Sequence, residues 1–315
     1  MSALLNLVSI LVFPGMLFLL VLGLAGQLVD RKLYARLQNR VGPPWFQPVA
    51  DLFKLLGKEP VVPEEADRRM FTLAPVFALA AVIAAYLYIP LWGTKPVFSF
   101  QGDLVVVLYL LLIPTLTFFL GGWYSRSIFS TLGAVRSITQ LFAYEIPLLI
   151  ALFSPALLAN TWSIAGIVAW YGAHPWLWLV NLLGFAVGLV TLLGKLERVP
   201  FDAPEAETEI VAGSFTEYSG RYLAFFRLAI DSEAVVSSSL LAAVFLPFGM
   251  GLPAWLGALV YLAKVAGILA VLALLRTVFA RLRMDQMIAF CWRYVAPVAF
   301  LQVIIDLVVK EFVWR

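Results

Sequence analysis

The stretch ERVPFDAPEAETEIVAGSFTEYSGRYLAFFRLAIDSE, from Glu197 to Glu233, is the longest acid-rich segment in a chain that is otherwise mostly apolar. Long hydrophobic segments flank it on both sides. If these segments cross a membrane, the stretch either forms a contact surface for soluble partners or feeds charge toward the membrane. After Glu197 itself, its carboxylates are Asp202, Glu205, Glu207, Glu209, Glu217, Asp231 and Glu233.

The composition of the whole chain is that of an integral membrane protein. Of the 315 residues, 63% are hydrophobic and 13% are charged, and the mean hydropathy is +0.95. A soluble domain carries about 25% charged residues, so we expect lipid to contact most of the surface. The N-terminal segment has no basic start and no small-residue cleavage site, so we interpret it as a retained span and not as a signal peptide.

Apolar runs of about 20 residues predict an all-α bundle of eight transmembrane helices. We expect a single transmembrane domain over residues 1–315, with cytoplasmic loops near 30–70, 123–137, 196–234 and 280–291. The expected spans are Leu4–Val29, Phe71–Trp92, Leu104–Gly122, Ile138–Thr161, Trp176–Lys195, Val235–Gly251, Ala254–Phe279 and Trp292–Trp314.

Lys and Arg residues gather in alternate loops, which sets the expected orientation. By the positive-inside rule, the odd-numbered loops face the cytoplasm and both termini face outside the cell membrane. The net charge of +3 therefore reflects membrane orientation and not nucleic-acid binding. The first loop alone carries Arg31, Lys32, Arg36, Arg40, Lys54, Lys58, Arg68 and Arg69, whereas the opposite face carries only Lys95, Lys310 and Arg315.

Several kinds of chemistry are excluded by residue counts. The single cysteine, Cys291, allows no internal disulfide and no cysteine-ligated iron–sulfur cluster held by this chain alone. The single histidine, His174, excludes a multi-histidine metal or haem site. No nucleophile–base set or phosphate-binding loop is present in the sequence. We therefore expect no cofactor or metal on this chain and no bond chemistry performed by it alone.

The first loop contains an expected amphipathic helix in WFQPVADLFKLLGKE, Trp45 to Glu59. Such a helix lies at the membrane boundary. It is either an anchor on the lipid surface or the wall of a cavity that opens at the interface. Its apolar residues are Phe46, Val49, Phe53 and Leu56, and its charged face carries Asp51, Lys54 and Lys58.

Three ionisable residues lie inside expected spans. Glu145, in QLFAYEIPLLIALF, has apolar neighbours nearly all round, and a charge there costs about 2.5–3.5 kcal/mol. It forms either a structural hydrogen bond or a proton relay, and we favour the relay. Lys264 and Asp306 are isolated in apolar runs, where they form either a structural pair or part of an ion path.

The acidic stretch also has a local helical signal. Asp202 is placed to cap a helix that has Glu205 at its third position. Glu205 and Glu209 would then share one face of that helix. A solvated acidic surface is the simple alternative, but clustered carboxylates at a low-dielectric boundary can share protons.

The run ERVPFDAPEAETEIVAGSFTEYSG, Glu197 to Gly220, closely resembles the signature loop of the H subunit of bacterial respiratory complex I, whose mitochondrial counterpart is subunit one of NADH dehydrogenase. The resemblance covers nearly the whole chain in order. It extends to NRVGPP and QPVADLFKLLGKE in the first loop, to AYEIP around Glu145 and to RLRMDQMIAFCWRYVAPVAF before the last span.

The resemblance implies a subunit that anchors a cytoplasmic redox arm to the membrane arm and starts an ion path. By motif, the acids of this path are Glu145, Asp202, Glu205, Glu207, Glu209 and Glu217, and Lys264 and Asp306 are candidates by their position in the spans. The expected contacts with the redox arm or a quinone cavity are Arg36, Arg40, Gln47, Asp51, Lys54, Phe201, Arg221, Arg283 and Asp285.

The first loop departs from the pattern of quinone-reducing members, where it is longer. Here NRVGPP runs almost directly into WFQPVADLFKLLGKE. This short form resembles the homologous subunit of energy-converting, membrane-bound nickel–iron (NiFe) hydrogenases, which use no quinone. We therefore favour a hydrogenase-type complex over the alternative, the quinone-site subunit of NADH:quinone oxidoreductase. A stand-alone transporter is a third possibility, but the sequence shows no internal inverted repeat.

The hydrogenase-type resemblance also implies the partners. These are iron–sulfur and NiFe-hydrogenase-like large and small subunits of the cytoplasmic arm, small membrane subunits, antiporter-like subunits and the lipid bilayer, with no nucleic acid. Iron–sulfur clusters and a NiFe site would lie in the partner subunits. In the alternative, quinone and flavin would take their place.

Overall fold

The computed structural model describes residues 2–93, 95–249 and 251–313, without the side chains of residues 2–6, 207, 208 and 313. No residue in these ranges is in a β-strand. The α-helices are α1 (Ser2–Leu11), α2 (Met16–Leu37), α3 (Gln47–Gly57), α4 (Arg68–Tyr86), α5 (Asp103–Tyr124), α6 (Ile128–Ala159), α7 (Ile164–Ala173), α8 (Leu182–Lys195), α9 (Glu207–Ile210), α10 (Gly220–Phe245), α11 (Ala254–Val278), α12 (Met284–Phe290) and α13 (Ala296–Val313).

Short irregular helices complete several spans. The 3-10 helix η1 (Leu177–Asn181) leads into α8, and the π-helical turn η3 (Cys291–Val295) joins α12 to α13. Eight helices of the described chain are long and apolar enough to cross a membrane. The prediction of an all-α membrane protein with eight spans is therefore confirmed.

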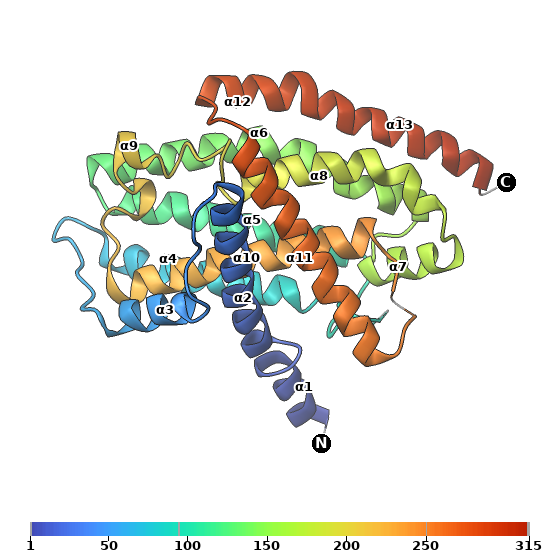
Figure 1. The fold of residues 1–315 in the computed structure, drawn as a ribbon, viewed down its shortest axis with the longest axis horizontal. Coiled ribbons are helices and arrows are strands. Elements are labelled where there is room, and N and C mark those ends of the chain that lie inside the picture. Colours follow the sequence, from blue (N-terminus) through green and yellow to red (C-terminus); the bar gives the residue numbers. More distant parts are fainter. Residues whose placement is uncertain (1, 94, 250, 314–315) are drawn as a thin grey trace.

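Helix α10 is the most enclosed of the eight spans. It packs against α2, α4 and α11, and Figure 1 shows it running through the middle of the bundle. Its small residues permit this close approach. Ser238 and Ser239 satisfy their own hydroxyls, each donating at 2.7 Å to the carbonyl oxygen one turn earlier. The two carboxylates near the middle of α10, Asp231 and Glu233, are buried inside the protein.

Several helices extend beyond their expected ends, and the largest extensions are those of α6 and α10. Helix α6 begins at Ile128 and not at Ile138, and α10 begins at Gly220 and not at Val235. Residues 128–137 and 220–234, which we expected in loops, are therefore helical. An apolar run marks only the part of a helix that is in contact with lipid or with the protein core. The helix itself continues into polar residues such as Arg136 and Arg227.

The first span also differs from its expected form. It breaks between α1, which ends at Leu11, and α2, which begins at Met16. Pro14 cannot donate a backbone hydrogen bond, which explains the break. Helix α2 then continues to Leu37, past the expected end at Val29.

The amphipathic helix α3 is present and borders the bundle. It packs against α2 and α10. Phe53 is 67% exposed on its outer side, whereas Pro48 is buried on its inner side. Both expected roles are therefore compatible with its position, because one face is free for lipid and the other faces the interior.

The acidic loop lies directly on the backbones of α5 and α6. A Cβ atom at Gly133 of α6 would meet the backbone nitrogen of Ser214 at 2.4 Å, and one at Gly122 of α5 would meet Ser214 Cα at 3.1 Å. Gly213 itself has a φ of +53°. Glycine is needed at these positions because a side chain would displace the loop.

Candidate functional site

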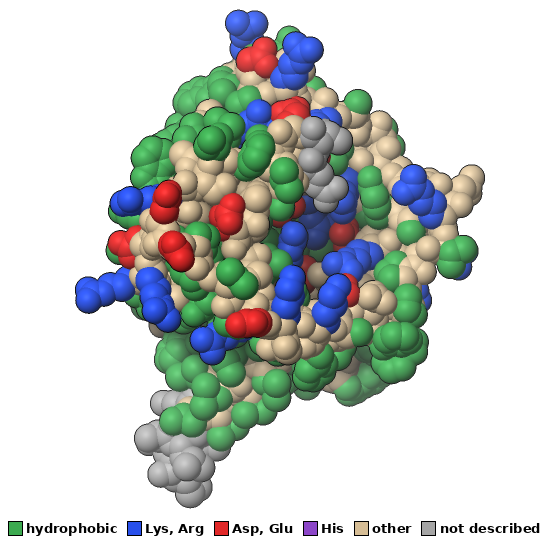
Figure 2. All heavy atoms as spheres, turned by 90° about the vertical axis from the view of Figure 1, so that its left-hand side faces the viewer, with side chains coloured by type: hydrophobic (Ala, Val, Ile, Leu, Met, Phe, Trp, Pro, Cys, Tyr) green, Lys and Arg blue, Asp and Glu red, His purple; other side chains and the backbone are tan. Residues whose placement is uncertain are grey.

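A charged cavity of about 670 Å³ lies between the acidic loop, α2, α10 and the segment after α11. Figure 2 shows basic and acidic side chains gathered around a hollow on this face of the molecule. The cavity carries equal numbers of acidic and basic side chains, so their charges can compensate one another. The acids are Asp30, Glu197, Asp202, Glu205 and Asp231, and the arginines are Arg31, Arg198, Arg227, Arg276 and Arg281.

Asp30 of α2 organises one wall of this cavity. Its carboxylate lies 2.7 Å from Arg198 of the loop and 3.4 Å from Arg276 of α11. Asp30 is buried, and the guanidinium of Arg276 lies 4.2 Å from the ring centroid of Tyr34. The contact with Arg276 is a charge-assisted hydrogen bond, which fixes geometry strongly, whereas the contact with Arg198 is an ion pair. One carboxylate thus joins three segments that are far apart in the sequence.

The loop carboxylates pair with arginines from the surrounding elements. Glu209 lies 2.6 Å from Arg136 of α6, and the hydrogen bond and charge of Arg136 lower the pKa of this exposed carboxyl. Glu205 lies 3.4 Å from Arg227 of α10. Exposed pairs contribute little stability each, so their main effect is to hold the loop in place.

The expected helix cap at Asp202 is wrong. The short helix α9 begins at Glu207, and its N-cap residue is Ala206, which offers no side-chain cap. Asp202 instead lies 3.1 Å from Arg281, which follows α11. The attraction of a nearby guanidinium outweighs the weak local preference for a capping box. The side chain of Glu207 lies outside the described residues.

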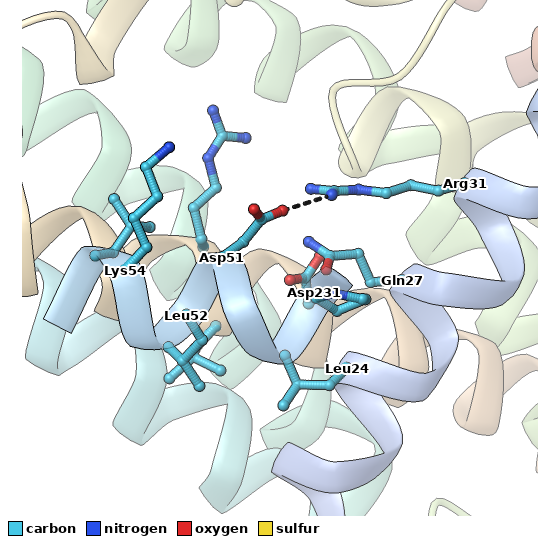
Figure 3. A pocket seen from close by; sticks show the side chains of 11 residues that line it. Leu24, Gln27, Arg31, Asp51, Leu52, Lys54 and Asp231 are labelled. Carbon is cyan, nitrogen blue, oxygen red and sulfur yellow. Dashed lines mark hydrogen bonds and ion pairs between the residues drawn. The ribbon is translucent and has the colours of Figure 1, made fainter. Parts of the chain in front are cut away.

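A second cavity, of about 300 Å³, lies beside the amphipathic helix α3. It shares lining residues with the charged cavity, including Gln27, Arg31 and Asp231. Figure 3 shows Arg31 reaching Asp51 of α3, with Gln27 and Asp231 next to each other beside this pair. The inner face of α3 is therefore a cavity wall.

Asp51 is held in its charged form at the mouth of this second cavity. It accepts hydrogen bonds from Arg31 at 2.9 Å and from Gln47 at 2.8 Å. Burial opposes the charge, but these two donors keep the pKa of Asp51 below its ordinary value. Lys54 lines the same cavity, with Leu52 and Leu55 as apolar neighbours.

Buried charged residues continue from the charged cavity into the bundle. Lys195, at the end of α8, lies 3.3 Å from Glu233 of α10 and donates a hydrogen bond at 2.5 Å to the carbonyl oxygen of Leu111. Glu197 is buried just beyond Lys195, and burial together with the charge of Glu205 raises its pKa to about 8. The charges of Glu197 and Glu233 lie close enough to interact.

Glu145 of α6 extends this group of buried acids. It is 8% exposed, and its charge interacts with those of Lys195 and Glu233. Its Oε2 atom has no hydrogen-bond partner among the described residues. It borders a cavity of about 10 Å³ with Lys195 and Ser237, which is room for one water molecule. The series Glu205, Glu197, Glu233 and Glu145 thus connects the loop with the middle of α6.

Lys264 and Asp306 do not form the structural pair that the sequence suggested as one alternative. Lys264 donates at 2.6 Å to the carbonyl oxygen of Leu246, at the end of α10, and lies 4.6 Å from the ring centroid of Phe248. Asp306 hydrogen bonds with Ser154 and Gln302. Each buried group has its own partners, so neither needs the other.

The expected arm-contact residues divide by exposure. Phe201 is buried against Phe290, so it supports the loop from within. Gln47 and Asp51 are half-buried, and Glu217 is half-buried in the loop. The remaining members are exposed and available to a partner: Arg36, Arg40, Lys54, Arg221, Arg283 and Asp285. Among the described residues, no group of three or more His, Cys, Asp or Glu is placed to hold a metal ion.

A comparison with known proteins decides the family. The family model described as NADH dehydrogenase matches residues 8–307. The chain belongs to the NADH dehydrogenase family. The H subunit of the NADH-quinone oxidoreductase of Syntrophotalea carbinolica is 34% identical, and the match covers 100% of this chain and 99% of that one. Subunit 8 of the Thermus thermophilus enzyme is 35% identical over 87% of this chain and 79% of that one.

The fold of this NADH dehydrogenase family chain also occurs in a solved complex. A chain of the membrane-bound sulfane sulfur reductase, an archaeal respiratory membrane complex, superposes with a TM-score of 0.87 at 25% sequence identity. The match covers 97% of this chain and 100% of that one. The protein is therefore a membrane component, of the H-subunit type, in a multi-subunit respiratory complex. The resemblance noted in the sequence is confirmed at this level.

Five buried charged residues of the site are not among those expected from the sequence to carry function. All of them lie at an end of an apolar run or just beyond it. In a sequence, charged residues at such positions indicate only where a transmembrane span ends. Charged residues one helical turn apart at such ends, as in Arg227 and Asp231, are the signal that could have revealed them. The five are Asp30, Lys195, Glu197, Asp231 and Glu233.

Proposed function

We propose that this chain anchors a cytoplasmic redox arm and couples it to ion movement in a membrane-bound, NiFe-hydrogenase-type complex. The observation that carries the proposal is a series of carboxylates whose charges interact in turn, from Glu205 in the loop, through Glu197 and Glu233, to Glu145. Charged residues buried in a membrane protein are costly and commonly mark ion or proton pathways. Here the series begins at a surface and ends inside the bundle.

The arrangement suggests how the coupling would work. A change of charge in the docked arm would act first on the loop carboxylates, which arginines hold at the cavity rim. Glu197 would respond next, because its pKa of about 8 lies close to neutral pH. A proton gained or lost there would alter the field at Glu233 and Lys195, and through them at Glu145. No bond chemistry is required of this chain.

Two observations favour the hydrogenase-type assignment. Only a short segment separates the end of α2 at Leu37 from the start of α3 at Gln47. In addition, the sulfane sulfur reductase chain matches this one along nearly its whole length. In such a complex, partner subunits of the arm would supply the iron–sulfur clusters and the NiFe site, and antiporter-like subunits would continue the ion path.

The cavity beside α3 favours the second candidate, a quinone-site subunit. Its apolar side carries Leu24, Leu52 and Leu55, while Gln27 and Asp51 could hydrogen bond a quinone carbonyl or hydroxyl. The curated relatives are also NADH-quinone oxidoreductase subunits by name. Against this, the larger cavity beyond it is lined by many charged side chains, which suit an apolar quinone ring poorly.

Purification of the intact complex from its native membranes through a tag on this chain tests the proposal. We expect mass spectrometry to identify a NiFe-hydrogenase-like large subunit and iron–sulfur subunits. Recovery of flavin-containing NADH dehydrogenase subunits instead would reject the hydrogenase-type assignment. In parallel, a photoreactive quinone should leave α3 unlabelled, and labelling of Leu52 or Leu55 that excess quinone suppresses would support the second candidate.

A further inference from the structure

A second buried polar network lies in the half of the bundle away from the acidic loop. It is formed by Asp306 of α13, Gln302 one turn before it, Ser154 of α6, Asn181 of η1 and Tyr171 of α7. None of these side chains is more than 1% exposed. Among the described residues, no ion pair joins Asp306 to a cation. A buried carboxylate without a counter-ion is costly, so its state of protonation is set by its hydrogen bonds.

The hydrogen positions in this network follow from one backbone group. The amide N–H of Gly184 can only donate, and it lies 3.2 Å from Gln302 Oε1. The Gln302 side chain must therefore present its oxygen to Gly184 and its nitrogen to the other side. There Gln302 Nε2 donates to the carbonyl oxygen of Val180 at 3.0 Å and to Asp306 Oδ1 at 2.9 Å.

The orientation of Asn181 follows from that of Gln302. Gln302 Nε2 also lies 3.3 Å from Asn181 Oδ1. If the Asn181 amide were turned over, two NH₂ groups would face each other, so its oxygen must lie on this side. Its nitrogen then donates to the hydroxyl of Tyr171 at 2.8 Å. Asn181 Oδ1 accepts its closest hydrogen bond, at 2.8 Å, from Ser154 Oγ.

Ser154 has only one hydroxyl hydrogen, and Asn181 Oδ1 takes it. Yet Ser154 Oγ is also in hydrogen-bond contact with Asp306 Oδ2. Two oxygen atoms cannot form this contact without a hydrogen between them. We propose that Asp306 carries that hydrogen: it is a protonated carboxyl that donates to Ser154 Oγ, and the network is a binding site for one proton. Asp306 Oδ1 remains the acceptor for Gln302.

The network borders a cavity that lies away from the acidic loop. Tyr171 lines a cavity of about 460 Å³, together with Trp178 and Phe248. Figure 1 places α7 at the end of the molecule opposite α9. The charge of Asp306 interacts with Tyr171. One turn further along α13 lies Lys310, whose ammonium donates to Asn160 Oδ1 at 2.9 Å.

The position of this proton suggests a use in transport, and that part of the inference rests on the proposed function. Asp306 would be a second proton-binding position in this subunit, near the face opposite the redox arm. Its proton would be exchanged when Ser154 or Asn181 shifts with α6 or η1. The presence of the proton itself does not depend on the identity of the partner subunits.

Infrared spectroscopy of the purified complex in lipid tests for the proton directly. We expect the Asp306→Asn variant to assemble normally, because its Nδ2 can donate to Ser154 Oγ and its oxygen can accept from Gln302. One C=O stretching band of a protonated carboxyl, sensitive to exchange into D₂O, should disappear. Asp67→Asn is the matched control: Asp67 accepts backbone hydrogen bonds at the exposed start of α4, and this band should stay unchanged.

If Asp306→Asn loses a carboxylate band and keeps every protonated-carboxyl band, the inference is wrong. If Asp306→Asn fails to assemble, the infrared spectrum of Ser154→Ala tests the same inference. Removal of the hydroxyl that accepts the hydrogen bond should shift the C=O band of protonated Asp306 to higher frequency. An unshifted band would contradict the proton site. The role in transport is tested separately by the number of ions transported per electron. This ratio should be lower in Asp306→Asn than in the unchanged complex, and an equal ratio would overturn the role in transport. Failure of the proposed function would instead be seen in the purification, as flavin-containing NADH dehydrogenase subunits in place of a NiFe-hydrogenase-like large subunit.

Discussion

The ammonium of Lys195 lies 3.3 Å from the carboxylate of Glu233, and both side chains are 2% exposed. The two residues belong to α8 and α10, and both helices pass through the region where Glu145 projects from α6. A buried ion pair of this kind rarely adds much stability, because removing both charges from water is costly. Because the pair lies between the loop and Glu145, it can transmit a change of charge from the loop to Glu145.

Breaking this pair should destabilise the protein. In Lys195→Met, Glu233 would remain buried without its cation, at a cost of about 3–5 kcal/mol. We expect a lower midpoint of thermal unfolding for the purified complex. The double variant Lys195→Met/Glu233→Gln should recover part of the loss, because no unpaired charge remains. A double variant that is less stable than Lys195→Met would show that Glu233 is held by other groups.

Replacement of Glu145 by Gln should separate transport from assembly. The amide keeps the size of the side chain but cannot release a proton. We expect ion transport by the reconstituted complex to be largely lost, while the amount of assembled complex stays normal. Glu64→Gln, the same change at an exposed loop position, is the control. Full transport by Glu145→Gln would make this residue structural.

Glu197 should make stability depend on pH. Its pKa rises from 4.5 to about 8 on burial. Between these values the folded protein binds more protons than the unfolded chain, so stability falls as pH rises through this window. In Glu197→Gln this fall should be weaker. Thermal unfolding of both proteins at a series of pH values measures the difference, and identical profiles would refute the assignment.

Gly213→Ala should displace the acidic loop. The added Cβ would lie 1.9 Å from the carbonyl oxygen of Pro204, and the residue has a positive φ that alanine adopts poorly. We expect little assembled complex in membranes. Gly267→Ala introduces the same methyl group inside α11, where nothing lies within 4 Å. That control should assemble fully, and equal assembly of the two variants would show that the loop tolerates the change.

Local patterns in the sequence predict much of this architecture. The eight spans follow from the length of apolar runs, and α3 follows from the alternation of residues such as Phe53 and Lys54. Both signals arise within a few turns of one helix, so they need no knowledge of packing. The ends of helices are harder to predict, because α6 and α10 continue past their apolar runs into polar turns.

The contacts that build the site depend on packing between distant segments. Asp30 meets Arg198 and Arg276 only because α2, the loop and α11 converge, and no local pattern records that convergence. The same reason explains why Lys264 and Asp306 are not partners: each finds hydrogen-bonding groups on a helix next to its own. The acids of the loop motif could be named from the sequence, but their arginine partners could not.

Arg281, which follows α11, lies 3.1 Å from Asp202 in a loop made much earlier in the chain. Because the ribosome works from the N-terminus to the C-terminus, this loop emerges during synthesis before the residue that holds it. The loop therefore reaches its final form only after α11 has entered the bilayer. In the proposed complex, an unfinished chain would present an incomplete docking face. Recruitment of the redox arm would then be limited to subunits whose membrane insertion is almost complete.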